Sequence, residues 1–223
     1  AYGVTILVTV IGTFFSLLFT SMLAYVLARK DFKLGRVFSF MVFFAMLFNG
    51  GLVSTYIMMV QYYHVKDTLF ALIIPYLIMP WHIFLMKGLL SDIPTSLIDA
   101  AKIDGAGEVK TFFRIILPIS KPAMATVGLF IAFTYWNDWY QSMLYIDDAS
   151  LSSLQYYLYR IMNNIQYLSS SMMSGSVSID MASLPSETAR MALCLLAAGP
   201  MLVIFPFFQK YFVKGITVGA VKG

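Results

Sequence analysis

Apolar residues gather in five long stretches of the chain, and polar residues are concentrated between them. The stretches run from about residue 2 to 28, 37 to 63, 68 to 86, 122 to 139 and 191 to 212. A helix of about 20 apolar residues crosses the hydrocarbon core of a bilayer. The pattern therefore predicts an all-α integral membrane protein whose 223 residues form a single transmembrane domain.

The composition excludes a soluble or a disordered protein. Hydrophobic residues make up 60% of the chain and charged residues 12%, and the mean hydropathy is +0.79. Soluble domains are roughly 45–50% apolar and about 25% charged. The single cysteine excludes a disulfide scaffold and a Cys-based zinc site. Because the sequence offers no cluster of His, Asp and Glu for catalysis, we predict no catalytic residue, no metal site and no cofactor bound by this chain.

The positions of the basic residues predict how the chain crosses the membrane. If the first span ends in the cytoplasm, only Lys66, Arg160 and Arg190 lie outside, and the other twelve of the 15 Lys and Arg residues lie inside. This split follows the positive-inside rule and indicates a membrane rather than a nucleic-acid partner. The connection at 87–121 and the C-terminus are then cytoplasmic, and the connection at 140–190 is external. Residue 1 would lie outside, so we expect a further span before it.

The interiors of the predicted spans contain no Asp, Glu, Lys or Arg. Ion-coupled carriers usually place such residues in the membrane, where charge is costly. His82 is the one candidate for a proton relay, and a hydrogen-bonded packing residue is the favoured interpretation. Broken helices also bind ions through backbone groups, so an ion-coupled secondary carrier stays an alternative.

The segment Gly105–Thr111 superficially resembles a phosphate-binding loop. That loop needs a glycine directly before its lysine, so that backbone N–H groups can surround the phosphates. Val109 stands in that position, before Lys110. We therefore predict that this chain does not bind or hydrolyse ATP.

The cytoplasmic connection at 87–121 predicts two short helices joined by a turn. The first runs from Pro94 to Ile103 with Pro94 in its first turn, the turn is Asp104 to Gly107, and the second runs from Glu108 to Ile116 and is ended by Pro118. We expect the first helix to present Ala100 and Ala101 as a small, flat surface for another protein's groove. The alternative is an interfacial helix that lies on the lipid headgroups.

The spacing of residues in this connection resembles the EAA loop of permeases from binding-protein-dependent ABC importers. Asp99-Ala100-Ala101 is followed after three residues by Gly105-Ala106, and after eight more by Ile115-Ile116-Leu117-Pro118. Asp99 replaces the usual Glu and keeps its charge. The resemblance implies a MetI-like core of five transmembrane helices with a cytoplasmic EAA coupling helix. It assigns ATPase coupling to Asp99, Ala100, Ala101, Gly105, Ala106, Ile115, Leu117 and Pro118.

The C-terminal sequence resembles that of the second permease subunit of maltose-type carbohydrate importers, in the branch that serves oligo- and polysaccharides. The resemblance implies an ATPase contact through Gly215, Thr217, Gly219 and Lys222, with a frayed terminus as the alternative. Asn49-Gly50-Gly51 and Trp136-Asn137-Asp138 also match that family. Many relatives have a proline shortly after the glycine pair, whereas this chain has Ser54, so we expect a less kinked second span.

The family implies a set of partners in a bacterial plasma (inner) membrane. They are a second, different permease subunit, a homodimeric ATPase that binds ATP and Mg²⁺, an extracytoplasmic sugar-binding protein and an oligosaccharide substrate. Within this class, a permease for a non-sugar solute is the alternative. A membrane-bound enzyme of polysaccharide metabolism is disfavoured, because no catalytic constellation is present.

Two groups outside the coupling loop are candidate contact residues. Aromatic faces stack on sugars and polar groups bind hydroxyls, which suggests a substrate pathway at Asn49, Tyr135, Trp136, Asn137 and Asp138. An interfacial aromatic belt explains the same aromatic residues. Tyr and Arg are enriched at protein interfaces. We therefore expect a binding-protein contact at Tyr156, Tyr157, Arg160 and Asn163, with an interfacial helix on the bilayer as the alternative.

Overall fold

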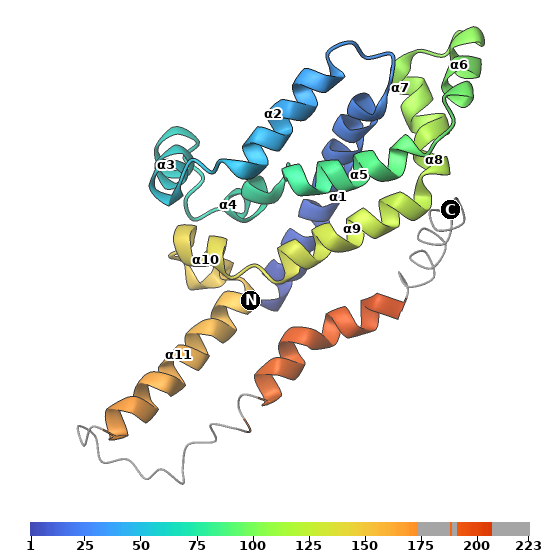
Figure 1. Ribbon diagram of the computed structural model, residues 1–223. Coiled ribbons are helices and arrows are strands. Elements are labelled where there is room, and N and C mark those ends of the chain that lie inside the picture. The colour runs from blue at the N-terminus through green and yellow to red at the C-terminus, as the bar shows by residue number, and fades with distance from the viewer. Residues whose placement is uncertain (174–187, 189–190, 207–223) are drawn as a thin grey trace.

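A computed structural model describes residues 1–173, 188 and 191–206, and all regular elements in these residues are helices. Helix α1 (Tyr2–Ala28) runs through the centre and packs against α5 (Pro80–Ser91) and α9 (Lys121–Trp136). Figure 1 shows these three helices crossing one another as the core of the molecule. Ile83, Met86, Val127 and Ile131 are buried between them.

Small and hydroxyl-bearing residues make up most of the buried face of α1, whereas most of its large apolar residues are exposed. The buried small and hydroxyl-bearing residues are Thr5, Thr9, Gly12, Ser16, Thr20, Ser21 and Ala24, and the buried large residues are Val8, Tyr25 and Leu27. Phe14, Phe15 and Val10 point outward. In a membrane, small residues let helices approach closely while large apolar residues face lipid. The distribution on α1 is therefore that of a transmembrane helix.

Among the described helices, α1 alone is long and apolar enough to cross a bilayer by itself. Three bent pairs are long and apolar enough when each pair is taken as one span. A helix over Met191–Pro206 covers the described part of the predicted fifth span, whose predicted end at residue 212 lies outside the described residues.

The second span is sharply bent, so the expectation of a less kinked helix is wrong. Helix α2 (Gly35–Leu47) and the following helical segment, α3 (Leu52–Ile57) with a π-helical turn at Met58–Tyr62, meet at 108°. Gly51 has φ +87°, and its N–H donates to the Asn49 side-chain oxygen at 2.9 Å. Glycine takes a positive φ without strain, so the bend needs no proline.

The third span is broken between two prolines. Helix α4 (Leu69–Ile73) continues as a 3₁₀ turn (Ile74–Tyr76) and meets α5 at 50°. Pro80 has no N–H for the Tyr76 carbonyl, which accepts instead from Ser16 Oγ at 3.3 Å. Leu77 N–H bonds to Ile74, which frees the Ile73 carbonyl to accept from Tyr135 Oη at 2.9 Å. Side chains of neighbouring helices thus satisfy the backbone at the break, as a membrane interior requires.

The connection at 87–121, which we predict to be cytoplasmic, contains three further helices. They are α6 (Thr95–Ile103), α7 (Glu108–Thr111) and, after a π-helical turn at Phe112–Ile116, α8 (Leu117–Ile119). Pro118 does not end the second helical segment, because the helical residues continue through α8 to Ile119. The chain turns instead at Ser120, and the segment meets α9 at 85°.

The other connection begins with α10 (Tyr140–Tyr145), a 3₁₀ turn (Ala149–Leu151) and α11 (Leu154–Met173). The Leu154 N–H donates to Thr5 Oγ1, near the start of α1, at 2.8 Å. Arg29, just past the other end of α1, contacts Glu108 of α7. The two connections therefore lie at opposite ends of α1 (Figure 1).

Helix α1 lies against α9 at Gly12, where an added Cβ would lie 2.6 Å from Cζ of Tyr135. We predict that Gly12→Ala displaces the Tyr135 ring, breaks its bond to Ile73 and costs about 1–3 kcal/mol of stability. Thermal unfolding in detergent measures this loss. Gly88→Ala in α5 is the control, since nothing lies within 4 Å of its added Cβ. Equal melting temperatures for the two variants would contradict the prediction.

Candidate coupling site

The end of α6 is a Schellman motif, and the spacing of the EAA pattern is the spacing of this motif. Gly105 adopts φ +72°, and its N–H donates to the Lys102 carbonyl at 3.0 Å. The Ala106 N–H donates to the Ala101 carbonyl at 2.9 Å. These two bonds close a helix end around one left-handed residue, which is usually glycine. Gly105, Ala101 and Ala106 therefore act together through their backbone groups to end the helix and reverse the chain.

Ala100 and Ala101 do not form one surface, contrary to the expectation. Ala101 is only 3% exposed, whereas Ala100 is exposed. Adjacent residues of a helix point about 100° apart, so one faces the protein while the other faces outward. Ala101 thus packs inside the connection and Ala100 lies on its outer side, while Asp99 is exposed and borders the cavity described below.

An apolar stripe on the outer side of α6 was missed in the sequence. Leu97, Ala100 and Ile103 are spaced three residues apart and all are exposed, Ile103 to 86%. Residues at this spacing share one helix face. The spacing of three residues between Leu97, Ala100 and Ile103 is the sequence signal for this face. We call these three residues the outer stripe.

Four charged residues tie both sides of the Gly105 turn to the end of α1, and we call them the charge cluster. They are Arg29, Asp31, Lys102 and Glu108. Arg29 binds both carboxylate oxygens of Asp31 and also contacts Glu108. Lys102 Nζ donates to Asp31 Oδ2 at 2.7 Å. Because Lys102 precedes the turn and Glu108 follows it, a displacement of α6 acts directly on the end of α1.

The charges of this cluster are mutually stabilising. Hydrogen bonds from Arg29 and then Lys102 hold the pKa of Asp31 well below its usual range. The hydrogen bond to Asp31 raises the pKa of Arg29 above its usual value. The Arg29 side chain is only 11% exposed, and its guanidinium lies 5.7 Å from the centre of the Tyr25 ring. A planar guanidinium with several donors suits such a multiple contact.

A polar cavity of about 580 Å³ lies between the end of α1, the end of α5 and α6. Its lining includes Arg29, Asp31, Asp92, Thr95 and Asp99. It separates the outer part of α6 from the membrane core, and it leaves the charge cluster as a principal polar link between α6 and α1.

The remaining predicted coupling residues of this connection differ in burial. Ile115 and Leu117 are half-buried and Pro118 is exposed, while the intervening Ile116 is fully buried. Ile116 is therefore the main packing residue of that group. Gly215, Thr217, Gly219 and Lys222, the predicted C-terminal contacts, lie outside the described residues.

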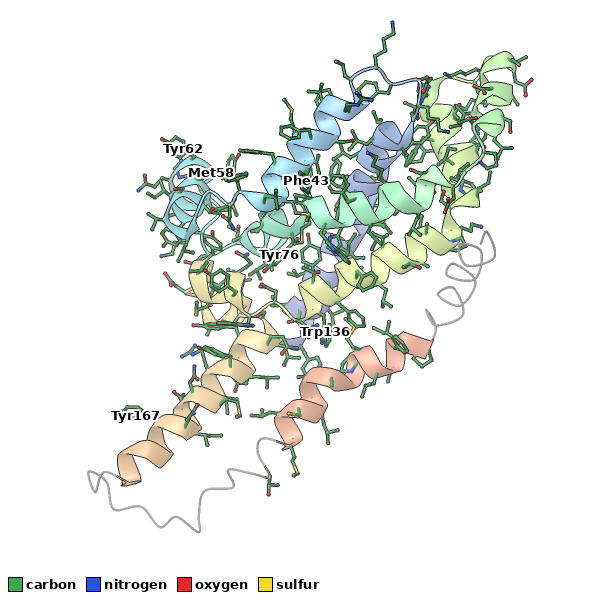
Figure 2. All side chains as sticks on the ribbon, viewed as in Figure 1. Phe43, Met58, Tyr62, Tyr76, Trp136 and Tyr167 are labelled. Carbon is green, nitrogen blue, oxygen red and sulfur yellow. The ribbon has the colours of Figure 1, made fainter. Side chains whose placement is uncertain are left out.

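Three of the five predicted substrate-pathway residues are buried and bonded within the chain. Tyr135 donates to Ile73, as above. Trp136 Nε1 donates to the Ala197 carbonyl at 2.9 Å, and in Figure 2 Trp136 lies between α9 and the final helix. Asp138 accepts from Tyr76 Oη at 2.8 Å. These contacts give the three residues packing roles that the sequence did not reveal.

Asn49 and Asn137 are exposed, but each side chain also bonds to nearby backbone. A direct substrate contact by any of the five residues stays a prediction. The predicted binding-protein residues share one helix, α11, where Tyr157, Arg160 and Asn163 are exposed and Tyr156 is half-buried. The Arg160 guanidinium lies 5.8 Å from the centre of the Tyr156 ring.

His82 is buried, and its Nδ1 has no hydrogen-bond partner among the described residues. The hydrogen-bonded role expected for that nitrogen is therefore absent from this part of the chain. In the same residues, no group of three or more His, Cys, Asp or Glu side chains is arranged to hold a metal ion.

Comparisons with known proteins find relatives over nearly the whole chain. A family model described as "Binding-protein-dependent transport system inner membrane component" matches residues 8–218. Protein LplC of Bacillus subtilis (strain 168) is 38% identical over 99% of this chain and 73% of its own length. The polygalacturonan/rhamnogalacturonan transport system permease protein YtcP of the same organism is 40% identical over 99% of this chain and 76% of its own length.

A solved structure has the same fold. It is described as the crystal structure of a bacterial ABC transporter involved in the import of the acidic polysaccharide alginate, and it matches with a TM-score of 0.79. The sequences are 28% identical, and the match covers 95% of this chain and 74% of that chain. This likeness confirms the MetI-like, all-α fold that the sequence resemblance implied.

The Gly105 turn generates the first prediction from this site. An L-residue in the left-handed region costs about 1–2 kcal/mol. We expect Gly105→Ala to loosen the turn and speed trypsin cleavage after Lys102 and Lys110, while the protein stays in the membrane. Gly107→Ala is the matched control, because Gly107 has φ −69° and open space around its Cβ. Equal cleavage rates for both variants would count against the Schellman assignment.

The charge cluster generates a prediction about pH. Each ion pair of an exposed carboxylate contributes about 0.2–1 kcal/mol to the free energy of unfolding. We expect Asp31→Asn to lower the melting temperature in detergent by a constant amount between pH 6 and 8. Because the pKa of Asp31 is depressed, its contribution is complete above its unfolded pKa of about 4 and is lost as the pH falls further.

The difference between wild type and Asp31→Asn should therefore shrink below about pH 4. Asp92→Asn, at an exposed carboxylate near α6, is the control. A difference that stays the same in acid would show that Asp31 contributes through packing rather than charge.

Proposed function

The chain belongs to the family of binding-protein-dependent transport system inner membrane components, and we propose that it is one of two permease subunits of an ATP-driven carbohydrate importer. The single observation that carries the mechanism is the double attachment of the Gly105 turn to α1 through the charge cluster. This permease forms half of the translocation pathway. It is a transport subunit and no enzyme, since ATP and Mg²⁺ bind to the partner ATPase.

The outer stripe is the proposed docking surface for the ATPase. Exposed apolar residues on a short cytoplasmic helix suit a groove on another protein, and Asp99 beside them offers a polar contact. When the two ATPase subunits close on ATP, they displace α6. The charge cluster passes the displacement to α1, and α1 passes it to α5 and α9 through close packing. The C-terminal residues 215–222 are a second proposed ATPase contact.

The proposed substrate is an oligo- or polysaccharide delivered by an extracytoplasmic binding protein in a bacterial plasma membrane. The names of relatives support this class, since YtcP is named for polygalacturonan and rhamnogalacturonan and MelC of Bacillus subtilis for melibiose, raffinose and stachyose. Helix α11 is the proposed binding-protein contact. Its exposed Tyr157, Arg160 and Asn163 have the side-chain chemistry of a protein interface.

The proposal is tested by purifying the chain with the permease, ATPase and binding protein of its own gene neighbourhood and measuring sugar uptake into proteoliposomes. We expect uptake to need both ATP and the binding protein. Ile103→Asp should abolish copurification of the ATPase, since a charge in the outer stripe cannot enter an apolar groove. Val109→Asp, also exposed but on α7, is the control and should retain the ATPase. Uptake driven by an ion gradient without ATPase would overturn the proposal.

A further inference from the structure

Asp138 occupies the corner where four parts of the chain meet. It lies between α9 and α10 and is 9% exposed. Its Oδ1 accepts from Tyr76 Oη at 2.8 Å and from the Gln141 N–H, in the first turn of α10, at 3.2 Å. Its backbone carbonyl accepts from Ser153 Oγ at 3.0 Å. A buried carboxylate needs such partners, but the choice of partners here joins segments that are far apart in the sequence.

One partner, Tyr76, belongs to the break in the third span. Its own carbonyl is held by Ser16 of α1, and its ring meets the Tyr135 ring edge-on at 5.8 Å. Tyr76 therefore moves with the break. Its bond to Asp138 carries that movement to the end of α9 and the start of α10.

Ser153, which donates to the Asp138 backbone carbonyl, directly precedes α11. Its Oγ accepts from the Tyr156 N–H at 3.3 Å, which caps the helix, while its own N–H donates to Ser142 of α10 at 3.1 Å. The next N–H, of Leu154, donates to Thr5 of α1. The first turn of α11 is thus fastened on several sides, and the rest of α11 runs away from this corner (Figure 1).

We propose that Asp138 is a positioning residue that joins the root of the external helix α11 to the break in the third span. The Asp138 carboxylate fixes the backbone of this corner through Tyr76 and Gln141, and the Asp138 backbone carbonyl accepts the bond from Ser153. The carboxylate that holds Tyr76 therefore sets the direction of α11 indirectly, through the position of that backbone. This inference rests on the proposed function, in which α11 meets the binding protein. In that setting Asp138 determines how well the binding protein docks, and it takes no part in the ATPase step.

Three substitutions separate the hydrogen-bonding role from the charge. Asp138→Ala removes both side-chain bonds. Asp138→Asn keeps an acceptor oxygen at Oδ1 and loses only the charge. Tyr76→Phe removes one donor, and Tyr62→Phe, which removes a hydroxyl from a residue that is 75% exposed, is its matched control.

The first experiment measures ATPase activity of the reconstituted complex against the concentration of sugar-loaded binding protein. We expect Asp138→Ala to raise the half-saturating concentration about threefold to tenfold, as the loss of one or two hydrogen bonds implies. Tyr76→Phe should give a smaller rise, and Asp138→Asn and Tyr62→Phe should resemble wild type. An unchanged half-saturating concentration in Asp138→Ala, or an Asp138→Asn as impaired as Asp138→Ala, overturns the inference.

The second experiment needs no transport activity. Nitroxide labels are placed at Gly3→Cys and Asn163→Cys, both exposed, after the exposed Cys194 is replaced by Ser. Pulsed electron resonance should give a narrow distance distribution for wild type and Asp138→Asn and a broad one for Asp138→Ala. Equal distributions in all three would overturn the inference. If the ATPase activity of the wild-type complex does not respond to the binding protein, the proposed function alone is refuted. The label distances still test the position of α11.

Discussion

The close approach of α1 to α9 at Gly12 is the contact on which the rest of the structure depends. Gly12 leaves room for the Tyr135 ring, and Tyr135 in turn satisfies the Ile73 carbonyl, which the 3₁₀ turn before Pro80 leaves without a helical partner. A bilayer offers no water for such a group. The broken third span is therefore stable only because α1 presents a small residue at this height. Gly12 thus links the packing of α1 against α9 to the break in the third span.

Helix α1 also joins the two faces of the protein. At one end, Arg29 holds both sides of the coupling turn through Asp31, Lys102 and Glu108. At the other end, Thr5 holds the first turn of α11. A packed helix transmits displacement along its axis, since interiors at close-packed density resist compression. Such a connection suits an importer, in which a motor on one side and a delivery protein on the other must act on one pathway.

The EAA pattern acquires a physical explanation from this structure. Its spacing from Ala101 to Gly105 and Ala106 is that of a helix end closed by two backbone bonds around a left-handed glycine. The motif thus describes a backbone shape as much as a binding surface. The surface that we propose for the ATPase contact is the outer stripe, and of the alanine pair only Ala100 contributes to it.

The sequence by itself determined the all-α membrane fold, because the length of its apolar stretches and the absence of charge within them leave few other structures. It also determined the coupling turn, since the positions of Gly105 and the alanines form a local backbone pattern. Tertiary structure alone decided which residues share a contact across long separations. The bond between Tyr76 and Asp138 and the bond of Arg29 to Glu108 join residues whose side chains carry no periodic signal. Burial of Tyr135 and Trp136 likewise depends on which helices pack beside them, and hydropathy does not distinguish a lipid-facing ring from a buried one.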